Sequence, residues 1–153
     1  MWYNRRRSHR MEQVSNNCGS SYLSALERSD CTVRATMEAC GITYDEAHAT
    51  LKAMGRKDKK GCPLTGMLTH RKVIAGCKVL SEMHFTDWSY GSKHPYGITL
   101  KKFVNTYKEG RWIVIRKSHA FAVIDGKIHD STSNSPNHYV EWAFRVTEQE
   151  GEF

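Results

Sequence analysis

The apolar residues follow a helical spacing at several places before residue 110 and a strand-like spacing after it. Three helices are predicted, each beginning after a residue that can cap its first turn and ending near a glycine. Their ranges are 31–40, 44–54 and 100–109, with Asp30, Thr43 and Thr99 as caps and Gly41, Gly55 and Gly110 as stops. Glu46 completes a capping box with Thr43, which makes the second helix the most clearly marked.

Short runs of β-branched and aromatic residues fill the chain from residue 112 onward and predict four strands. These strands span 112–116, 120–124, 127–131 and 139–146, with a turn-rich segment before the last. Earlier in the chain, 67–75 predicts a short helix and 78–83 a strand. Because helices come first and strands last, the predicted fold class is α+β, with N-terminal helices packed on a C-terminal antiparallel sheet of about four strands.

The dipeptide Asp125-Gly126 lies between two of these strands and predicts a two-residue hairpin turn. In that register residue 121 faces residue 130, and directly opposed residues share one face of the sheet. Since side chains alternate along a strand, His119 and Asp130 lie on the same face and His129 on the other. A three-residue loop would shift the register by one position and reverse this assignment.

Cys31 is predicted in the first turn of the helix that follows Asp30, where the helix dipole favours a thiolate. A thiol, an imidazole and a carboxylate are the groups of a nucleophilic triad. Taken singly, a buried cysteine and a histidine at a strand start are ordinary structural residues. The combination of a thiol at a helix start with His119 and Asp130 on one hairpin face favours a catalytic site.

Four short motifs accompany these residues. They are Asp-Cys-Thr-Val-Arg-Ala at 30–35, Tyr-Asp-Glu-Ala-His at 44–48, Gly-Arg-Lys at 55–57 and His-Ala-Phe-Ala-Val-Ile-Asp-Gly at 119–126. With the order cysteine, histidine, aspartate, the chain resembles the papain-like cysteine peptidase superfamily over about residues 29–132. It looks most like compact branches of that superfamily, the bacteriocin-processing peptidases and a set of short phage and bacterial proteins.

The resemblance implies a cysteine peptidase or amidase that acts on a peptide or protein through a thioester at Cys31. His119 would activate the thiol and protonate the leaving group, Asp130 would orient the histidine, and no cofactor is implied. Papain-like enzymes place a glutamine about six residues before the nucleophile to complete the oxyanion hole, and this chain has none there. The candidate donors in its place are Gln13, Asn17 and Ser29.

An alternative nucleophile string runs from Cys18 to Tyr22, after Gln13, and superficially resembles the papain motif. The position that should hold the cysteine is Ser21, and no capped helix clearly follows at the required place. Cys31 is therefore the preferred nucleophile.

With 153 residues, 39% hydrophobic and 25% charged, the chain fits one globular domain, for which 13–150 is the predicted extent. Residues 1–12 are polar and arginine-rich, and predict a basic flexible arm in place of a secretory signal. The absence of a membrane-length apolar run and of paired cysteine spacing predicts a cytoplasmic protein with reduced thiols, in the host cytoplasm if it is phage-encoded. The spacing of the nearest candidate zinc ligands, Cys18, Cys31, Cys62, His70 and Cys77, fits no metal site.

The formal net charge of +7 is concentrated in short basic clusters. A solvated surface is the commoner role of such clusters, and weak nucleic-acid contact is the second. The residues concerned are Arg5, Arg6, Arg7, Arg56, Lys57, Lys59 and Lys60. Two alternatives to hydrolysis remain: a catalytically weak or inactive papain-like fold that binds or inhibits a partner through this basic surface, and an acyl transferase in which an amine resolves the thioester.

Overall fold

The computed structural model describes residues 11–16, 18–19, 21–61, 68, 71–86 and 97–147. Within these ranges the helices are α2 (Tyr22–Leu26), α3 (Cys31–Cys40), α4 (Tyr44–Ala53) and α6 (Leu100–Thr106). The strands are β1 (Glu12–Val14), β2 (Val73–Ile74), β3 (Cys77–His84), β4 (Ile98–Thr99), β5 (Arg111–Arg116), β6 (His119–Ile124), β7 (Lys127–His129) and β8 (Tyr139–Val146). The predicted α+β class is confirmed.

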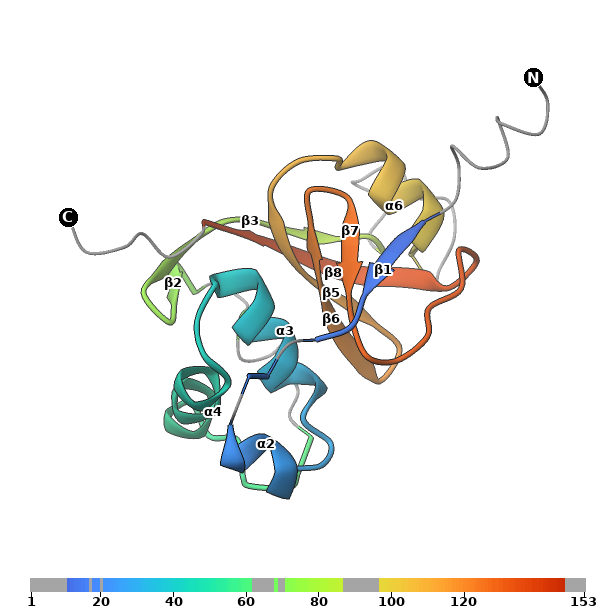
Figure 1. Ribbon diagram of the computed structural model, residues 1–153. Coiled ribbons are helices and arrows are strands. Elements are labelled where there is room, and N and C mark those ends of the chain that lie inside the picture. Colours follow the sequence, from blue (N-terminus) through green and yellow to red (C-terminus); the bar gives the residue numbers. More distant parts are fainter. Residues whose placement is uncertain are drawn as a thin grey trace.

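One eight-stranded sheet runs through the molecule in the order β1-β7-β6-β5-β8-β3-β2, with β4 paired to β8 (Figure 1). The expected sheet of about four antiparallel strands is therefore too small. It is also not wholly antiparallel, because β1 pairs with β7 in parallel. The four predicted strands correspond to β5 to β8 and form adjacent members of this sheet.

The strands that the sequence did not reveal are short and weakly patterned. In β1 all three residues are exposed, and β2 and β4 have two residues each, so period-two alternation has no room to develop. The predicted helix over 67–75 is wrong at Val73–Ile74, which form β2 against β3. Residues 67, 69 and 70 of that segment lie outside the described ranges.

Most helix caps follow the predicted chemistry, with two exceptions. The predicted stop of the third helix at Gly110 is wrong, because α6 ends at Thr106 with Tyr107 as its C-cap. Gly41 adopts the left-handed conformation after α3, Thr43 and Glu46 form the capping box of α4, and Thr99 accepts the Lys102 amide at the start of α6. Asp30 stands at the N-cap of α3, but its carboxylate makes no capping hydrogen bond.

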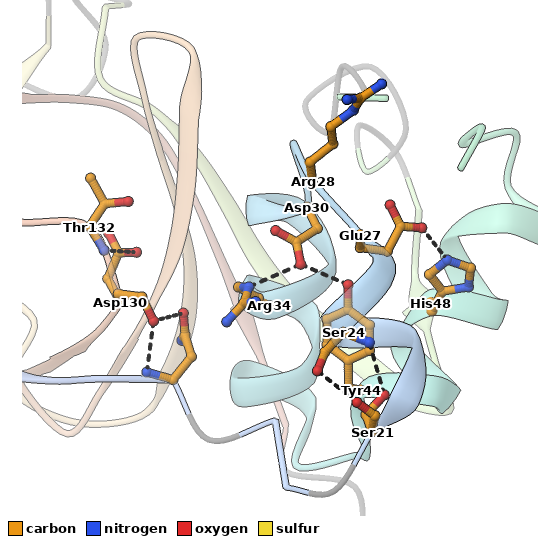
Figure 2. A network of polar contacts seen from close by, with 12 residues as sticks. Ser21, Ser24, Glu27, Arg28, Asp30, Arg34, Tyr44, His48, Asp130 and Thr132 are labelled. Carbon is orange, nitrogen blue, oxygen red and sulfur yellow. Dashed lines mark hydrogen bonds and ion pairs between the residues drawn. The ribbon is translucent and has the colours of Figure 1, made fainter. Parts of the chain in front are cut away.

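The carboxylate of Asp30 is turned instead toward two side chains. Its Oδ2 accepts from Nε of Arg34 at 3.0 Å and from the hydroxyl of Tyr44 at 2.7 Å (Figure 2). A charged guanidinium and a largely buried phenol are stronger partners for a carboxylate than a first-turn amide. The prediction that Asp30 caps α3 through its side chain is therefore wrong, and the residue links α3 to α4.

Each face of the sheet carries its own hydrophobic core. Helix α3 packs against β5 and β6, and Val33, Met37 and Ala122 belong to the core on that face. On the opposite face Phe103 of α6 packs with Phe121 and other residues that alternate with the first set along the strands. Two covered faces hold β6 rigidly in the middle of the fold, which matters because β6 begins with His119.

Two residues of the predicted basic arm, Met11 and Glu12, contact the predicted domain. Met11 is half-buried against the core, and Glu12 opens β1 opposite Lys127, so both belong to the domain and not to the arm. Residues 1–10, the rest of the predicted arm, lie outside the described ranges, as do 148–150 at the predicted end. Among the described helices, none combines the length and the apolar character needed to cross a bilayer.

The basic clusters are only partly at the surface. Lys57, Lys59 and Lys60 are exposed, whereas Arg56 is only 3% exposed. Arg56 enters the interior because Glu27 accepts its Nη2 at 3.1 Å, so the prediction of an exposed Arg56 for nucleic-acid contact is wrong. Arg5, Arg6 and Arg7 lie outside the described residues.

Candidate active site

Cys31 is the first residue of α3 and His119 is the first residue of β6. Small residues on β6, Ala120 and Ala122, face α3 and allow the helix to lie close to the strand. The start of the helix is thereby placed at the start of the strand. The His119 imidazole and the Ala120 amide both lie close enough to the Cys31 sulfur to lower the pKa of the thiol.

The hairpin between β6 and β7 has the predicted register. Ile124 pairs with Lys127 and Ala122 with His129 around a turn in which Asp125 and Gly126 both have positive φ, as a type I′ turn requires. The Nε2 atom of His119 lies 2.6 Å from Oδ2 of Asp130.

His129 points to the other face, as the alternation of side chains predicted. There its Nδ1 lies 3.2 Å from Oε2 of Glu38 on α3. The parity argument that selected Asp130 over His129 is confirmed in its geometry.

Asp130 is held by more partners than the sequence suggested. Its Oδ2 also accepts from Nδ2 of Asn134 at 2.7 Å. Its Oδ1 accepts from the Thr132 amide at 3.1 Å (Figure 2 shows the Thr132 contact). Asn134 is in turn fixed by Arg116, whose Nε donates to the Asn134 side-chain oxygen at 2.9 Å. The sequence marked residues 133–137 only as a turn, and no spacing rule relates Asn134 to Asp130.

The short strand β1 supports the backbone of the same residue. The Asp130 amide donates to the Val14 carbonyl at 2.8 Å. Nε2 of Gln13 donates to the Asp130 carbonyl at 3.1 Å and to the Thr132 carbonyl at 2.7 Å. Residues more than a hundred positions away in the sequence thus fix the carboxylate that orients His119.

The electrostatics of the site favour a thiolate beside an imidazolium. Burial opposes ionisation of Cys31, but the hydrogen bonds from His119 and the Ala120 amide outweigh it and lower the thiol pKa from its ordinary value of 9.0. Burial likewise opposes the charge on His119, yet the hydrogen bonds to Asp130 and Cys31 raise its pKa to about 9. Asp130 has a lowered pKa despite burial, because His119 and Asn134 donate to its carboxylate.

Cys18 and Cys40 lack this activation. All four described cysteines are free thiols. Burial raises the pKa of Cys18 and, far more strongly, that of Cys40, which lies in the interior next to Cys77. Cys31 is therefore the described thiol best suited to act as a nucleophile at neutral pH.

An open cleft of about 600 Å³ lies over the three residues. Cys31, His119 and Asp130 all line it. Apart from Cys31, every described residue in its lining is polar, charged or glycine, including Arg34 and four hydroxyl-bearing side chains. A polar substrate that enters this cleft can therefore reach the Cys31 sulfur.

The three oxyanion candidates have different fates. Ser29 lines the cleft, with a positive φ of 52° that is uncommon for serine. Gln13 is not in the described cleft lining, and its side-chain amide donates to backbone carbonyls. Asn17 lies outside the described residues.

Asn16, which the sequence did not suggest, lines the cleft and donates from Nδ2 to the His129 carbonyl at 3.2 Å. Ser21, the alternative nucleophile position, caps α2, so the expectation that no capped helix follows there is wrong. The residue is still a serine and not a cysteine.

A second group of ionisable side chains joins the end of α2 to α4 through Glu27 and His48. The ligand atoms of Glu27, His48 and Asp58 lie within 4.8 Å of one another, close enough to share a cation. The Glu27 carboxylate, however, already accepts both terminal nitrogens of Arg56 and contacts Nε2 of His48 at 2.6 Å (Figure 2 shows the His48 contact). The buried guanidinium supplies the positive charge that a metal would bring, so this group is a structural ion-pair network.

Comparison of the chain with protein-family models, with curated proteins and with solved structures gives no significant match. The resemblance to papain-like peptidases therefore stays a prediction that rests on the motifs and on the arrangement of Cys31, His119 and Asp130.

Proposed function

We propose that the protein is a cysteine hydrolase, a peptidase or amidase, with Cys31 as nucleophile. The observation that carries the proposal is the continuous chain of contacts from the Cys31 thiol through His119 to Asp130 at the floor of an open cleft. Nucleophile, base and orienting carboxylate are the three roles that acyl transfer to a thiol requires.

In the proposed reaction the Cys31 thiolate attacks the carbonyl carbon of the bound amide. The sulfur–carbon bond forms, and the carbonyl oxygen takes up negative charge. As the carbon–nitrogen bond breaks, the imidazolium of His119 gives its proton to the departing amine and leaves a thioester on Cys31. His119, now neutral, removes a proton from water, which attacks the thioester, releases the carboxylic acid and restores the thiolate–imidazolium pair.

Asp130 keeps His119 in the orientation that this cycle needs. With Nε2 engaged by the carboxylate, Nδ1 is the ring nitrogen left to face the sulfur. The negative charge developing on the carbonyl oxygen needs donors close to Cys31. The backbone amide of Cys31, the first residue of α3, and the Ser29 hydroxyl are the groups we assign to it.

A thiol-directed activity probe tests the proposal. At neutral pH the probe is expected to label Cys31 faster than the other four cysteines, and the labelling is expected to be lost in His119→Ala. Equal labelling of all five cysteines, or a Cys31 rate unaffected by His119→Ala, contradicts the proposed function. Peptide mass spectrometry of the full chain assigns the labelled residue.

A further inference from the structure

We propose that Arg34 is a specificity-determining residue that binds a carboxylate of the substrate beside Cys31. The inference rests on the proposed function, because it names the class of acyl substrate that the same cleft receives. Arg34 takes no part in the chemistry at the sulfur, and its role is to select substrates with negative charge near the bond that is cleaved.

The position of Arg34 follows from the helix that carries the nucleophile. It lies three residues after Cys31 on α3, so the two side chains leave the helix on neighbouring parts of one face. Both residues line the cleft, together with Asp130 on the opposite wall. In Figure 2 the Arg34 side chain leaves α3 on the side that faces Asp130.

The guanidinium is held in place before any substrate arrives. Its Nε donates to Oδ2 of Asp30 at 3.0 Å, and that same oxygen accepts the Tyr44 hydroxyl at 2.7 Å. The guanidinium carbon also lies 5.9 Å from the centre of the Tyr44 ring, and Tyr44 is only 1% exposed. A buried phenol thus anchors the carboxylate that orients the arginine, which lowers the entropy cost of binding to it.

The anchoring uses only one of the three guanidinium nitrogens. Among the described residues, no side chain or carbonyl accepts a hydrogen bond from either terminal nitrogen of Arg34. The side chain is 27% exposed, against 13% for its partner Asp30, so the donors remain accessible from the cleft. A planar pair of donors held in this way matches the two oxygens of a carboxylate.

The acidic groups that share the cleft do not cancel this preference. Both oxygens of Asp130 already accept hydrogen bonds, and His119 contributes a positive charge next to them. Asp30 engages Arg34 and Tyr44 through a single oxygen. The described lining offers no aliphatic or aromatic side chain to a hydrophobic substrate group, so charge and hydrogen bonding are the means of selection available.

The test compares iodoacetate with iodoacetamide as alkylating agents of Cys31 in the full chain. Both reagents form a sulfur–carbon bond and release iodide, and they differ by a carboxylate in place of an amide. The ratio of the iodoacetate rate to the iodoacetamide rate is expected to fall roughly tenfold in Arg34→Gln. Arg28→Gln, which removes the same charge from an exposed residue outside the described cleft lining, is the matched control and is expected to leave the ratio unchanged.

An unchanged ratio in Arg34→Gln, or an equal fall in Arg28→Gln, overturns the proposal. Any accessible thiol can be alkylated, so the ratio is measurable whether or not the protein turns over substrate. The proposed function is judged separately by the uncharged reagent alone, whose rate at Cys31 must fall in His119→Ala.

Two isomeric ligands identify which carboxylate Arg34 prefers. N-acetylglutamine carries its charge on the α-carboxylate, and N-acetylglutamate α-amide carries it on the side chain. The preferred isomer is expected to protect Cys31 from iodoacetamide in the wild-type protein, and Arg34→Gln is expected to remove that protection. If neither isomer protects better than the neutral N-acetylglutamine amide, the proposal is wrong.

Discussion

Nε2 of His119 lies 2.6 Å from Oδ2 of Asp130 across the hairpin of β6 and β7, on the face of the sheet opposite to His129. This contact is the link between the fold and the proposed chemistry, because it fixes the imidazole ring that meets the Cys31 thiol. The carboxylate itself is only 5% exposed, so its charge acts on the ring with little screening.

Replacing Asp130 by asparagine removes the charge and keeps the size of the side chain. We expect the pKa of His119 to fall, because the hydrogen bond and the charge of Asp130 both raise it. Hydrolysis is expected to drop about ten-thousandfold, the scale typical for replacing an orienting aspartate by asparagine. Unfolding curves should show a folded protein, and an unchanged hydrolysis rate in the folded variant contradicts the role of Asp130.

The pH dependence of reactivity follows from the two shifted groups. The pKa of Cys31 is lowered from 9.0, so its alkylation by iodoacetamide should persist below the range of an ordinary thiol. Hydrolysis also needs the imidazolium as acid, and since the His119 pKa is about 9, activity should decline as the pH rises through that value. In His119→Ala the pH at which Cys31 alkylation reaches half its maximal rate should rise. An identical pH profile in the variant and the wild-type protein contradicts the pairing of a Cys31 thiolate with a His119 imidazolium.

Asn134 is expected to act as a positioning residue for the carboxylate. In Asn134→Ala, Asp130 loses a 2.7 Å hydrogen bond to Oδ2, and the acid limb of Cys31 alkylation should shift upward with about a tenfold loss of hydrolysis. Asn137→Ala in the same turn is the matched control, since its exposed side chain makes no described contact with Asp130. A shift of equal size in both variants would mean that the loop matters and the Asn134 amide does not.

The buried pair of Glu27 and Arg56 is expected to dominate stability outside the cleft. Glu27→Ala leaves the guanidinium buried without its main partner and should cost about 3–5 kcal/mol of unfolding free energy. Lys52→Ala, which breaks the exposed pair with Asp58, should cost less than about 1 kcal/mol. Chemical denaturation of the two variants measures both values, and equal costs would contradict the buried pair's role.

The Glu27 carboxylate also makes the free energy of unfolding depend on pH in the acid range. Burial alone would raise the pKa of Glu27, but Arg56 and His48 lower it from 4.5 to about 2. Because the folded-state pKa is depressed, this contribution is fully present above pH 4.5 and is lost as the pH falls toward 2. In Glu27→Gln the free energy of unfolding should decrease less between pH 4.5 and about pH 2 than it does in the wild-type protein.

The sequence was informative where local chemistry determines structure. The turn at Asp125-Gly126 and the alternation of side chains were enough to place His119 beside Asp130, and the caps at Thr43 and Thr99 marked two helices. These features depend on residues close together in the chain, so their spacing carries the information.

The contacts that support the site from a distance could not be predicted in this way. Gln13 and Val14 bind the backbone at Asp130 and Thr132 from an exposed three-residue strand with no hydrophobic pattern. Asp30 was expected to cap its helix, but the side chains of Arg34 and Tyr44 compete more strongly for its carboxylate. Tertiary packing decides which of several possible partners a side chain binds, and the spacing of residues along the chain does not reveal that outcome.

The most direct test of the central claim is the fate of Cys31 during hydrolysis of p-nitrophenyl acetate. Attack by the thiolate releases p-nitrophenolate and leaves an acetyl thioester, which water then cleaves. We predict a stoichiometric burst of p-nitrophenolate, an acetyl group on Cys31 by mass spectrometry, and loss of both in Cys31→Ala. The same p-nitrophenolate release from Cys31→Ala, with acetylation found only on other residues, would contradict the account.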